Sequence, residues 1–389
     1  MAPNRRSDAT RRMIYLDYQA TTPLAPEVAA IMRPWIEEKF ANPHSASRWG
    51  REAAAAIEVA REQVENILFP QRRLSSANQG RFAFTSGATE ALNWAIKGTS
   101  ERSERRRLVT VATEHAAVLD SVEWLERQGC EVVRLPVCAD GLVDMDAARK
   151  AIDGKTALVV AMLVNNEIGV IQPIEDLAVL AHEVGAVMLC DAVQGFGRMV
   201  LPEGPDMIAV SAHKIHGPKG VGGLWIRKGC EPMPLLHGGG QEVGLRSGTL
   251  SPELCAGFGE AARLAGEHGD ADTLHVAKLF ETALTTLGKG WKLNGSSTHR
   301  YRGNLNLRRD GLDSARLISD LRNIAFSLGS ACASGSGRPS HVLRALGLGD
   351  REARSSIRLG FGRYTGELEL TLACDQIREA ADAQRGHGG

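Results

Sequence analysis

Three polar residues and one glycine stand where apolar runs of the sequence end. His115 follows the run LVTVA, Asp191 ends the run VMLC, and Lys214 follows MIAVSA. A carboxylate at the end of so apolar a run needs a cationic or hydrogen-bond-donating partner, because burial of an unpaired charge is costly. In the segment TSGATEA, Gly87 allows a tight turn from a strand into a helix whose first amides are unpaired.

Together these features favour the chemistry of pyridoxal 5′-phosphate (PLP). The N-terminus of a helix is a ready seat for a phosphate group, and here Ala88 and Thr89 would supply amides and a hydroxyl. PLP also needs a lysine amine for a Schiff base, an anion against its pyridinium nitrogen and a flat group over its ring. Lys214, Asp191 and His115 are suited to these three tasks. Each could alone have a purely structural role, and Lys219 is a competing lysine.

The elements that must position these residues are predicted to form an open α/β sheet. From Phe82 to about Gly223, short apolar runs alternate with helical patterns of roughly ten residues. Such runs indicate a mainly parallel sheet with helices on both faces, and the last runs could add an antiparallel edge. Ligands of open α/β sheets gather at the carboxyl ends of the strands, where His115, Asp191 and Lys214 are expected.

A change of pattern after Gly266 predicts a second domain. We expect residues 20–265 to form a large PLP-binding domain, and residues 1–19 with 266–389 to form a smaller α+β domain that carries Cys332. The helices expected in this smaller part lie at about 271–287, at 313–322, near 340–346 and from about Glu367 onward.

Composition argues against several other classes of protein. Lys+Arg and Asp+Glu each total 46, so the net charge is near zero and gives no indication of binding to nucleic acid or to an anionic membrane. No apolar run approaches the roughly 18 residues of a membrane span, and the N-terminus lacks the apolar part of a signal peptide. We therefore expect a cytoplasmic enzyme. The seven cysteines include no CxxC pair, so neither a disulfide framework nor a metal site is expected.

Eight segments, in chain order, resemble the successive motifs of the cysteine desulfurases of iron–sulfur cluster assembly. They are YLDYQATTP, TSGATEA, TEHAAV, VNNEIGVIQPI, SAHKIHGPKGVGGLW, HGGGQEVGLRSGTL, SLGSACASGSGRPSHVLRALG and SSIRLGFGRYT. That family belongs to the class V aminotransferase group of fold-type I PLP enzymes. The resemblance implies a large domain with a mainly parallel seven-stranded sheet flanked by helices, and a smaller α+β domain. The loop around Cys332 resembles the subgroup with a long catalytic loop.

The resemblance also implies a role for each residue that matches a motif. Lys214 would be the Schiff-base lysine, His115 would stack on the pyridine ring and Cys332 would be the nucleophile. Asp191 would pair with the ring nitrogen and Gln194 with the ring hydroxyl. The other implied residues are Ala88, Thr89, Ser211 and His213 at the phosphate, Thr249 at the phosphate of the other subunit's site, Asn166 beside the cofactor and substrate, and Arg358 at the substrate carboxylate.

The activity implied by this resemblance is the conversion of L-cysteine to L-alanine, with the sulfur kept as a persulfide on Cys332. The sulfur would pass to a cluster scaffold or a sulfur relay protein, for iron–sulfur cluster or thio-cofactor synthesis, and the enzyme would be a homodimer. The alternative is a selenocysteine lyase or another fold-type I PLP aminotransferase. A transaminase needs no thiol at Cys332, and a non-catalytic protein would not need Lys214, Asp191 and His115 as well.

Overall fold

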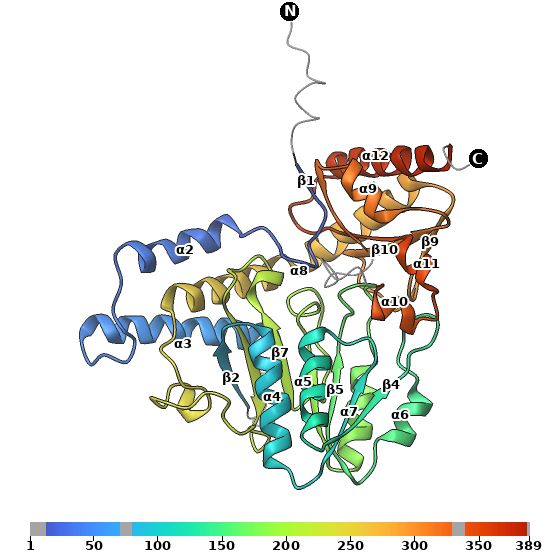
Figure 1. Ribbon diagram of the computed structural model, residues 1–389. Helices are drawn as coiled ribbons and strands as arrows, with labels where there is room; N and C mark the ends of the chain where they lie inside the picture. The colour runs from blue at the N-terminus through green and yellow to red at the C-terminus, as the bar shows by residue number, and fades with distance from the viewer. Residues whose placement is uncertain (1–12, 71–79, 329–338, 387–389) are drawn as a thin grey trace, which may run out of the picture.

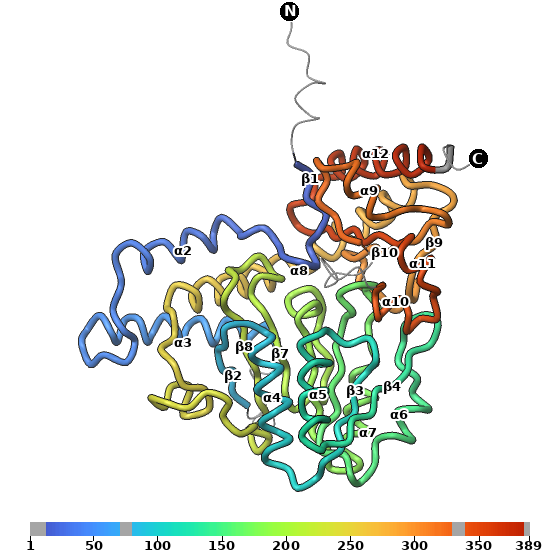
Figure 2. Tube along the Cα trace, in the orientation of Figure 1, coloured from blue at the N-terminus to red at the C-terminus, as the bar shows by residue number. Residues whose placement is uncertain are grey.

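A seven-stranded sheet forms the centre of the structure, a computed structural model that describes residues 13–70, 80–328 and 339–386. The strands lie in the order β2-β8-β7-β6-β5-β3-β4 (Figures 1 and 2). β8 runs antiparallel to both of its neighbours, and the other four pairings are parallel. The strands are β2 Gly80–Thr85, β3 Arg107–Val111, β4 Glu131–Leu135, β5 Thr156–Met162, β6 Val187–Asp191, β7 Met207–Ser211 and β8 Gly222–Arg227.

This architecture confirms the expected fold class and corrects one detail of it. The sheet is mainly parallel, has seven strands and is flanked by helices. The antiparallel strand expected at an edge lies inside the sheet instead. It does so because β2, which comes much earlier in the chain, pairs with the outer side of β8 from Gly80 opposite Arg227 to Thr85 opposite Gly222.

Side chains of the strands alternate between the two faces, and each face is covered by helices. In β5, Leu158 and Val160 pack in one buried cluster with α4 (Ala88–Arg102) and α5 (Ala116–Arg127). Val159 and Ala161 pack in another with α7 (Ile174–Glu183) and with several helices beyond it. Because both faces are buried, the strand sequence TALVVAM is almost wholly apolar.

The longest helix, α8 (Pro252–Leu287), extends from one part of the molecule into the other. It begins about twenty residues earlier than expected, where the Ser251 hydroxyl accepts a hydrogen bond from the Leu254 amide. Its first half packs in the core beside the seven-stranded sheet, and its second half packs in the core beside a smaller, four-stranded sheet. The expected domain boundary thus falls inside a continuous helix, and the division into two domains stays a prediction. The other helices beside the large sheet are α2 Pro26–Glu37, α3 Arg48–Leu68 and α6 Met145–Ala151.

A smaller group of strands and helices lies beside the large sheet, at the top of the view in Figure 1. It contains a four-stranded antiparallel sheet of order β12-β13-β10-β9 and the parallel pair β1-β11. None of the helices within the described ranges is long and apolar enough to cross a membrane. The elements are β1 Ile14–Tyr15, β9 Trp291–Leu293, β10 Asn304–Arg309, α9 Ser314–Asp320, β11 Ile324–Ala325, β12 Ser327–Leu328, α10 His341–Ala345, α11 Asp350–Arg354, β13 Ser356–Gly360 and α12 Glu367–Gly386.

Candidate active site

A cavity of about 530 Å³ gathers most of the residues predicted from the sequence. Its volume lies in the range of small-molecule sites. It opens where α4 begins and where β6 and β7 end, as expected for ligands of an open α/β sheet. The predicted residues that line it are Ala88, Thr89, His115, Asn166, Asp191, Gln194, Ser211, His213 and Lys214.

The N-terminus of α4 forms one wall of this cavity. The helix has 15 residues and begins after Gly87, so its first amides and the positive end of its dipole face the space lined by Ser211 and His213. The neighbouring strand approaches Gly87 very closely. A Cβ atom on Gly222 would come within 2.8 Å of the Gly87 Cα atom. Glycine at position 222 therefore sets the position of the helix terminus, which fits a seat for a phosphate group.

Lys214 enters the cavity from the short helix η2 (Ala212–Lys214) that follows β7. Its Nζ atom donates to the backbone carbonyls of Gln19 and, at 2.8 Å, of Ala20. Burial lowers the pKa of Lys214 to about 7, helped by the nearby charge of Arg198. Lys219 also lines the cavity, but its side chain is exposed and lies beyond the turn at Gly217. A partly buried amine that is easily deprotonated suits a nucleophile better than an exposed ammonium does.

Asp191 and His115 face the same space from β6 and from the loop after β3, two parallel strands that are separated in the sheet by β5. Asp191 ends β6 and is buried, and its Oδ1 atom accepts a hydrogen bond from the Val193 amide at 3.0 Å. Burial raises the pKa of this carboxyl, so a cation in the cavity would restore its ionised form. His115 caps α5, where its Nδ1 atom accepts from the Ala117 amide at 3.1 Å. Burial lowers the pKa of His115, and the cap leaves the ring proton on Nε2.

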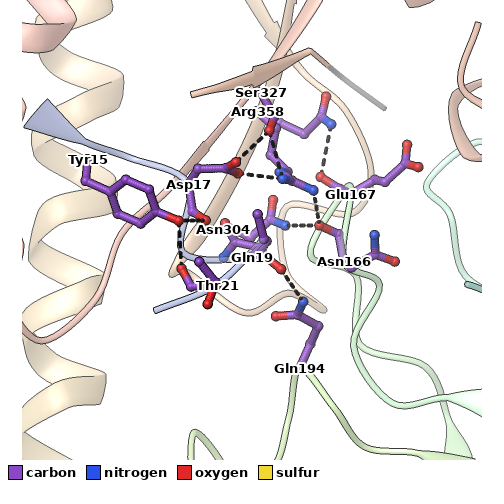
Figure 3. Close-up of polar contacts among 12 residues, drawn as sticks. Tyr15, Asp17, Gln19, Thr21, Asn166, Glu167, Gln194, Asn304, Ser327 and Arg358 are labelled. Carbon is purple, nitrogen blue, oxygen red and sulfur yellow. Dashed lines mark hydrogen bonds and ion pairs between the residues drawn. The ribbon is translucent and has the colours of Figure 1, made fainter. Parts of the chain in front are cut away.

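Arg358 does not line the cavity, but it contacts Asn166, a residue that does (Figure 3). The guanidinium is fully buried, and its Nη2 atom donates to Asp17 Oδ1 at 2.6 Å and to the Ser327 hydroxyl at 3.1 Å. Its Nη1 atom donates to the carbonyl of Asn166, a residue of the cavity wall, at 3.0 Å. Within the described part of the chain, Nε has no hydrogen-bond partner. A buried, unsatisfied donor next to the cavity suits recognition of a carboxylate.

Two predicted residues lie away from the cavity or outside the described residues. Thr249 is exposed and does not line the cavity, although its segment is tied to the first turn of α4 by an ion pair between Arg246 and Glu90 at 2.7 Å. Cys332 lies outside the described residues. The nearest described elements on its two sides are held near the cavity, since the Ser327 hydroxyl donates to Asp17 at 2.9 Å and the Ser340 hydroxyl donates to Glu167.

Several residues of the site escaped the sequence reasoning. Asp17 and Gln19 lie in the motif YLDYQATTP, which had been noted without roles for its members. Arg198 contacts both Gln194 and Lys214, and Glu167 anchors Ser340. The signal that could have pointed to Asp17 is a carboxylate next to a buried strand, the same signal that pointed to Asp191.

Comparison with known proteins shows the family to which the chain belongs. Residues 14–372 match the Aminotransferase class-V family. The chain is 41% identical over 383 residues to the cysteine desulfurase IscS of Rickettsia peacockii, covering 96% of this chain and 92% of that protein. A solved NifS-like protein superposes with a TM-score of 0.87 at 33% identity, over 95% of this chain and all of that one. The NifS-like protein of Rickettsia africae gives 0.85 at 28% identity, with the same coverage.

The chain therefore belongs to the class V aminotransferase family, whose enzymes depend on PLP and adopt fold type I. The relative with 41% identity is a cysteine desulfurase, which confirms the expected enzyme class and cofactor. The residues of the cavity fit PLP, since they supply an amine, a buried anion, an imidazole and a helix N-terminus in one space of suitable volume.

Proposed function

We propose that this protein converts L-cysteine to L-alanine, keeps the sulfur as a persulfide on Cys332, and passes it to an acceptor for iron–sulfur cluster or thio-cofactor synthesis. The observation that carries the proposal is the single cavity shared by Lys214, Asp191, His115 and the N-terminus of α4. These four features meet four separate requirements of PLP chemistry. The 41% identity to a cysteine desulfurase supports the choice of substrate.

Each side chain of the cavity is assigned one task toward the cofactor. When bound, PLP supplies an electron sink that stabilises negative charge on the α-carbon of an amino acid. Lys214 would hold the cofactor covalently, Asp191 would pair with its ring nitrogen, and His115 would cover its ring. Gln194 would contact the ring hydroxyl, and the phosphate group would be held by Ala88, Thr89, Ser211 and His213, with Asn166 beside the ring.

The lowered pKa of Lys214 equips it to move a proton. With a pKa of about 7, about half of the lysine is the free amine at neutral pH, whereas an ordinary lysine with a pKa of 10.5 is almost wholly protonated. Lys214 would take the α-proton of the substrate once the substrate amine has displaced it. The carbonyls of Gln19 and Ala20 would hold the resulting ammonium within reach of the cavity.

Sulfur transfer balances without any further reactant. The Cys332 thiolate attacks the sulfur of the substrate, so a sulfur–sulfur bond forms while the carbon–sulfur bond breaks. The electron pair of that bond stays on the carbon skeleton, which gains a proton and leaves as L-alanine. L-cysteine plus one enzyme thiol thus gives L-alanine plus one enzyme persulfide. His115, which carries its proton on Nε2, can donate a hydrogen bond to the substrate sulfur.

Arg358 would bind the carboxylate of the substrate. A guanidinium offers a planar fork for this group, and the Nε atom of Arg358 has no acceptor among the described residues. Asp17 now satisfies the other end of the guanidinium. A substrate carboxylate must therefore share Arg358 with Asp17 or replace it.

The proposal extends to the assembly and the surroundings of the enzyme. Thr249 is exposed and does not line the cavity described above, so a homodimer would let it reach the phosphate in the partner's cavity. We also propose the division into residues 20–265 and residues 1–19 with 266–389. A cytoplasmic location suits a thiol that must return to its reduced form in every cycle. The acceptor would be a cluster scaffold or a sulfur relay protein.

Two pairs of variants test the proposed function. Lys214→Ala should abolish the visible absorbance band of bound PLP, while Lys219→Ala, which changes a lysine of the same cavity, should keep it. Cys332→Ala should keep the band but stop sulfide release from L-cysteine in the presence of dithiothreitol, and the exposed Cys138 serves as the control for Cys→Ala. A band that survives in Lys214→Ala, or desulfuration at full rate by Cys332→Ala, would contradict the assignment.

A further inference from the structure

Arg198 lies behind the cavity, and its guanidinium reaches two of the proposed cofactor residues at once. Its Nη1 atom donates to the side-chain oxygen of Gln194 at 2.6 Å and lies 3.3 Å from the Gln194 carbonyl oxygen. Its Nη2 atom donates to the backbone carbonyl of Lys214 at 2.7 Å. The guanidinium also lies over the ring of Tyr301, with Cζ 5.3 Å from the ring centroid. These contacts hold both terminal nitrogens of the guanidinium fork, Nη1 and Nη2, in place.

The contact with Arg198 determines which way the Gln194 amide faces. A guanidinium has only donors, so the atom of Gln194 that faces Nη1 must be the amide oxygen. The amide nitrogen then points the other way and donates one of its two N–H groups to the Gln19 carbonyl at 3.0 Å. Since Gln194 lines the cavity, the second N–H group is left as a donor towards the cofactor.

The same contacts bear on the position and charge of Lys214. The Gln19 carbonyl that accepts from Gln194 also accepts from the amine of Lys214, so one oxygen joins both side chains. Arg198 in turn holds the peptide of Lys214 from behind. The charged groups that act on the amine are Arg198 and Arg358, which lower its pKa, and Asp17 and Asp191, which raise it. Burial is the largest cause of its low pKa, and Arg198 is the next.

We propose that Arg198 is a positioning residue: its fork fixes the Gln194 amide with an N–H group towards the cofactor and holds the Lys214 peptide so that the amine reaches the same cavity. This inference rests on the proposed roles of Lys214 and Gln194 and adds a residue that contacts neither substrate nor cofactor. A lysine at position 198 would keep the positive charge but has one nitrogen, so it could not bind both acceptors in the same geometry.

A double-mutant cycle tests the action through Gln194. In the wild-type background, Arg198→Lys should weaken PLP binding about tenfold, because it loosens one charge-assisted hydrogen bond that orients the amide. In the Gln194→Ala background, the same change should weaken binding by a clearly smaller factor, because no amide remains to be oriented and only the contact with the Lys214 carbonyl is disturbed. Equal losses of PLP affinity in both backgrounds would overturn the inference.

Titration of Lys214 in the full-length protein freed of PLP gives a second readout. The rate at which an acylating reagent modifies Lys214, followed by mass spectrometry across pH, reports the pKa of its amine. Arg198→Met should raise this pKa by about one unit, and Arg198→Lys should leave it nearly unchanged, because removal of a like charge favours the protonated amine. An unchanged pKa in Arg198→Met would contradict the inference, since the Lys214 amine would then be independent of residue 198.

Arg302 offers a matched control in the same titration. It lines a groove that Arg198 also lines, lies over an aromatic ring as Arg198 does, and pairs at 3.1 Å with the exposed Glu281. Arg302→Met and Arg302→Lys should leave PLP affinity and the pKa of Lys214 unchanged. Failure of the proposed function would look different, because wild-type protein would then form no L-alanine and no Cys332 persulfide from L-cysteine. If only the role of Arg198 is wrong, wild-type protein still forms both products, and changes at Arg198 have no effect on PLP affinity or on the pKa of Lys214.

Discussion

Replacement of Asp17 by asparagine tests the proposed role of Arg358, because these two side chains now satisfy each other. Arg358 is fully buried, the side chain of Asp17 is 18% exposed, and the two are joined at 2.6 Å. The variant keeps an oxygen acceptor at position 17 but removes its negative charge. Arg358 then stays buried with neutral partners, which are the Asn166 carbonyl and the Ser327 hydroxyl.

The size of the effect follows from the burial of this pair. Removal of one partner from a buried ion pair costs about 3–5 kcal/mol. The retained amide oxygen and the partial exposure of position 17 should reduce this loss to about 2–3 kcal/mol. At roughly 2 °C per kcal/mol for a long chain, the apparent melting temperature should fall by roughly 4–6 °C. A bound carboxylate would restore a negative charge beside Arg358. L-alanine should therefore bind the variant about tenfold more tightly if about 1.4 kcal/mol is recovered.

Thermal melting of the PLP-bound protein at increasing L-alanine concentration measures both effects. The variant should melt below wild type without L-alanine and gain more stability as L-alanine is added. Asp310→Asn is the control, since Asp310 pairs with Lys292 at 2.7 Å and both side chains are largely exposed. The reasoning would be refuted by an Asp17→Asn protein that melts as wild type does and binds L-alanine no more tightly.

Three further predictions concern the cavity and its surroundings. Gly222→Ala should weaken PLP binding, measured by equilibrium dialysis, because its Cβ atom would lie 2.8 Å from the Gly87 Cα and displace the start of α4. Burial lowers the pKa of His213 and of His216 to about 4, so the folded protein binds fewer protons than the unfolded chain between pH 4 and 6.5. The melting temperature should therefore fall as the pH drops through this window. His216→Gln should make the melting temperature depend less steeply on pH. Thr249→Val by itself should bind PLP more weakly than wild type. When it is mixed with Lys214→Ala, each mixed dimer should regain one PLP site, built from Lys214 of one subunit and Thr249 of the other. If no site is recovered, the two subunits do not share a site.

The positions of His115, Asp191 and Lys214 could be predicted because each lies at or just beyond the end of an apolar run. In a parallel sheet such ends meet at one edge, so a pattern along the chain translates directly into proximity in space. The phosphate seat could be predicted for a similar reason, since a strand, a glycine and a helix follow one another without interruption in TSGATEA.

Contacts between distant segments could not be predicted in this way. Asp17 and Arg358 are 341 residues apart, and no local pattern says that β13 will come to lie beside the start of the chain. No sequence pattern around Arg198 predicts its contacts with Gln194 and Lys214. The early start of α8 was missed because its first turns contain Gly257 and Gly259. There a Cβ atom on Gly259 would come within 2.6 Å of the Ala60 Cα in α3, so helix packing, and not helix propensity, requires glycine.

The measurement that tests the central claim most directly is mass spectrometry of the protein after a single turnover. Purified protein is mixed with a limiting amount of L-cysteine without reductant, and L-alanine is quantified while the peptide that contains Cys332 is analysed. Our account predicts one L-alanine for each protein chain that gains a single extra sulfur atom on Cys332. Formation of L-alanine with Cys332 unmodified, or with the extra sulfur on another cysteine, would contradict it.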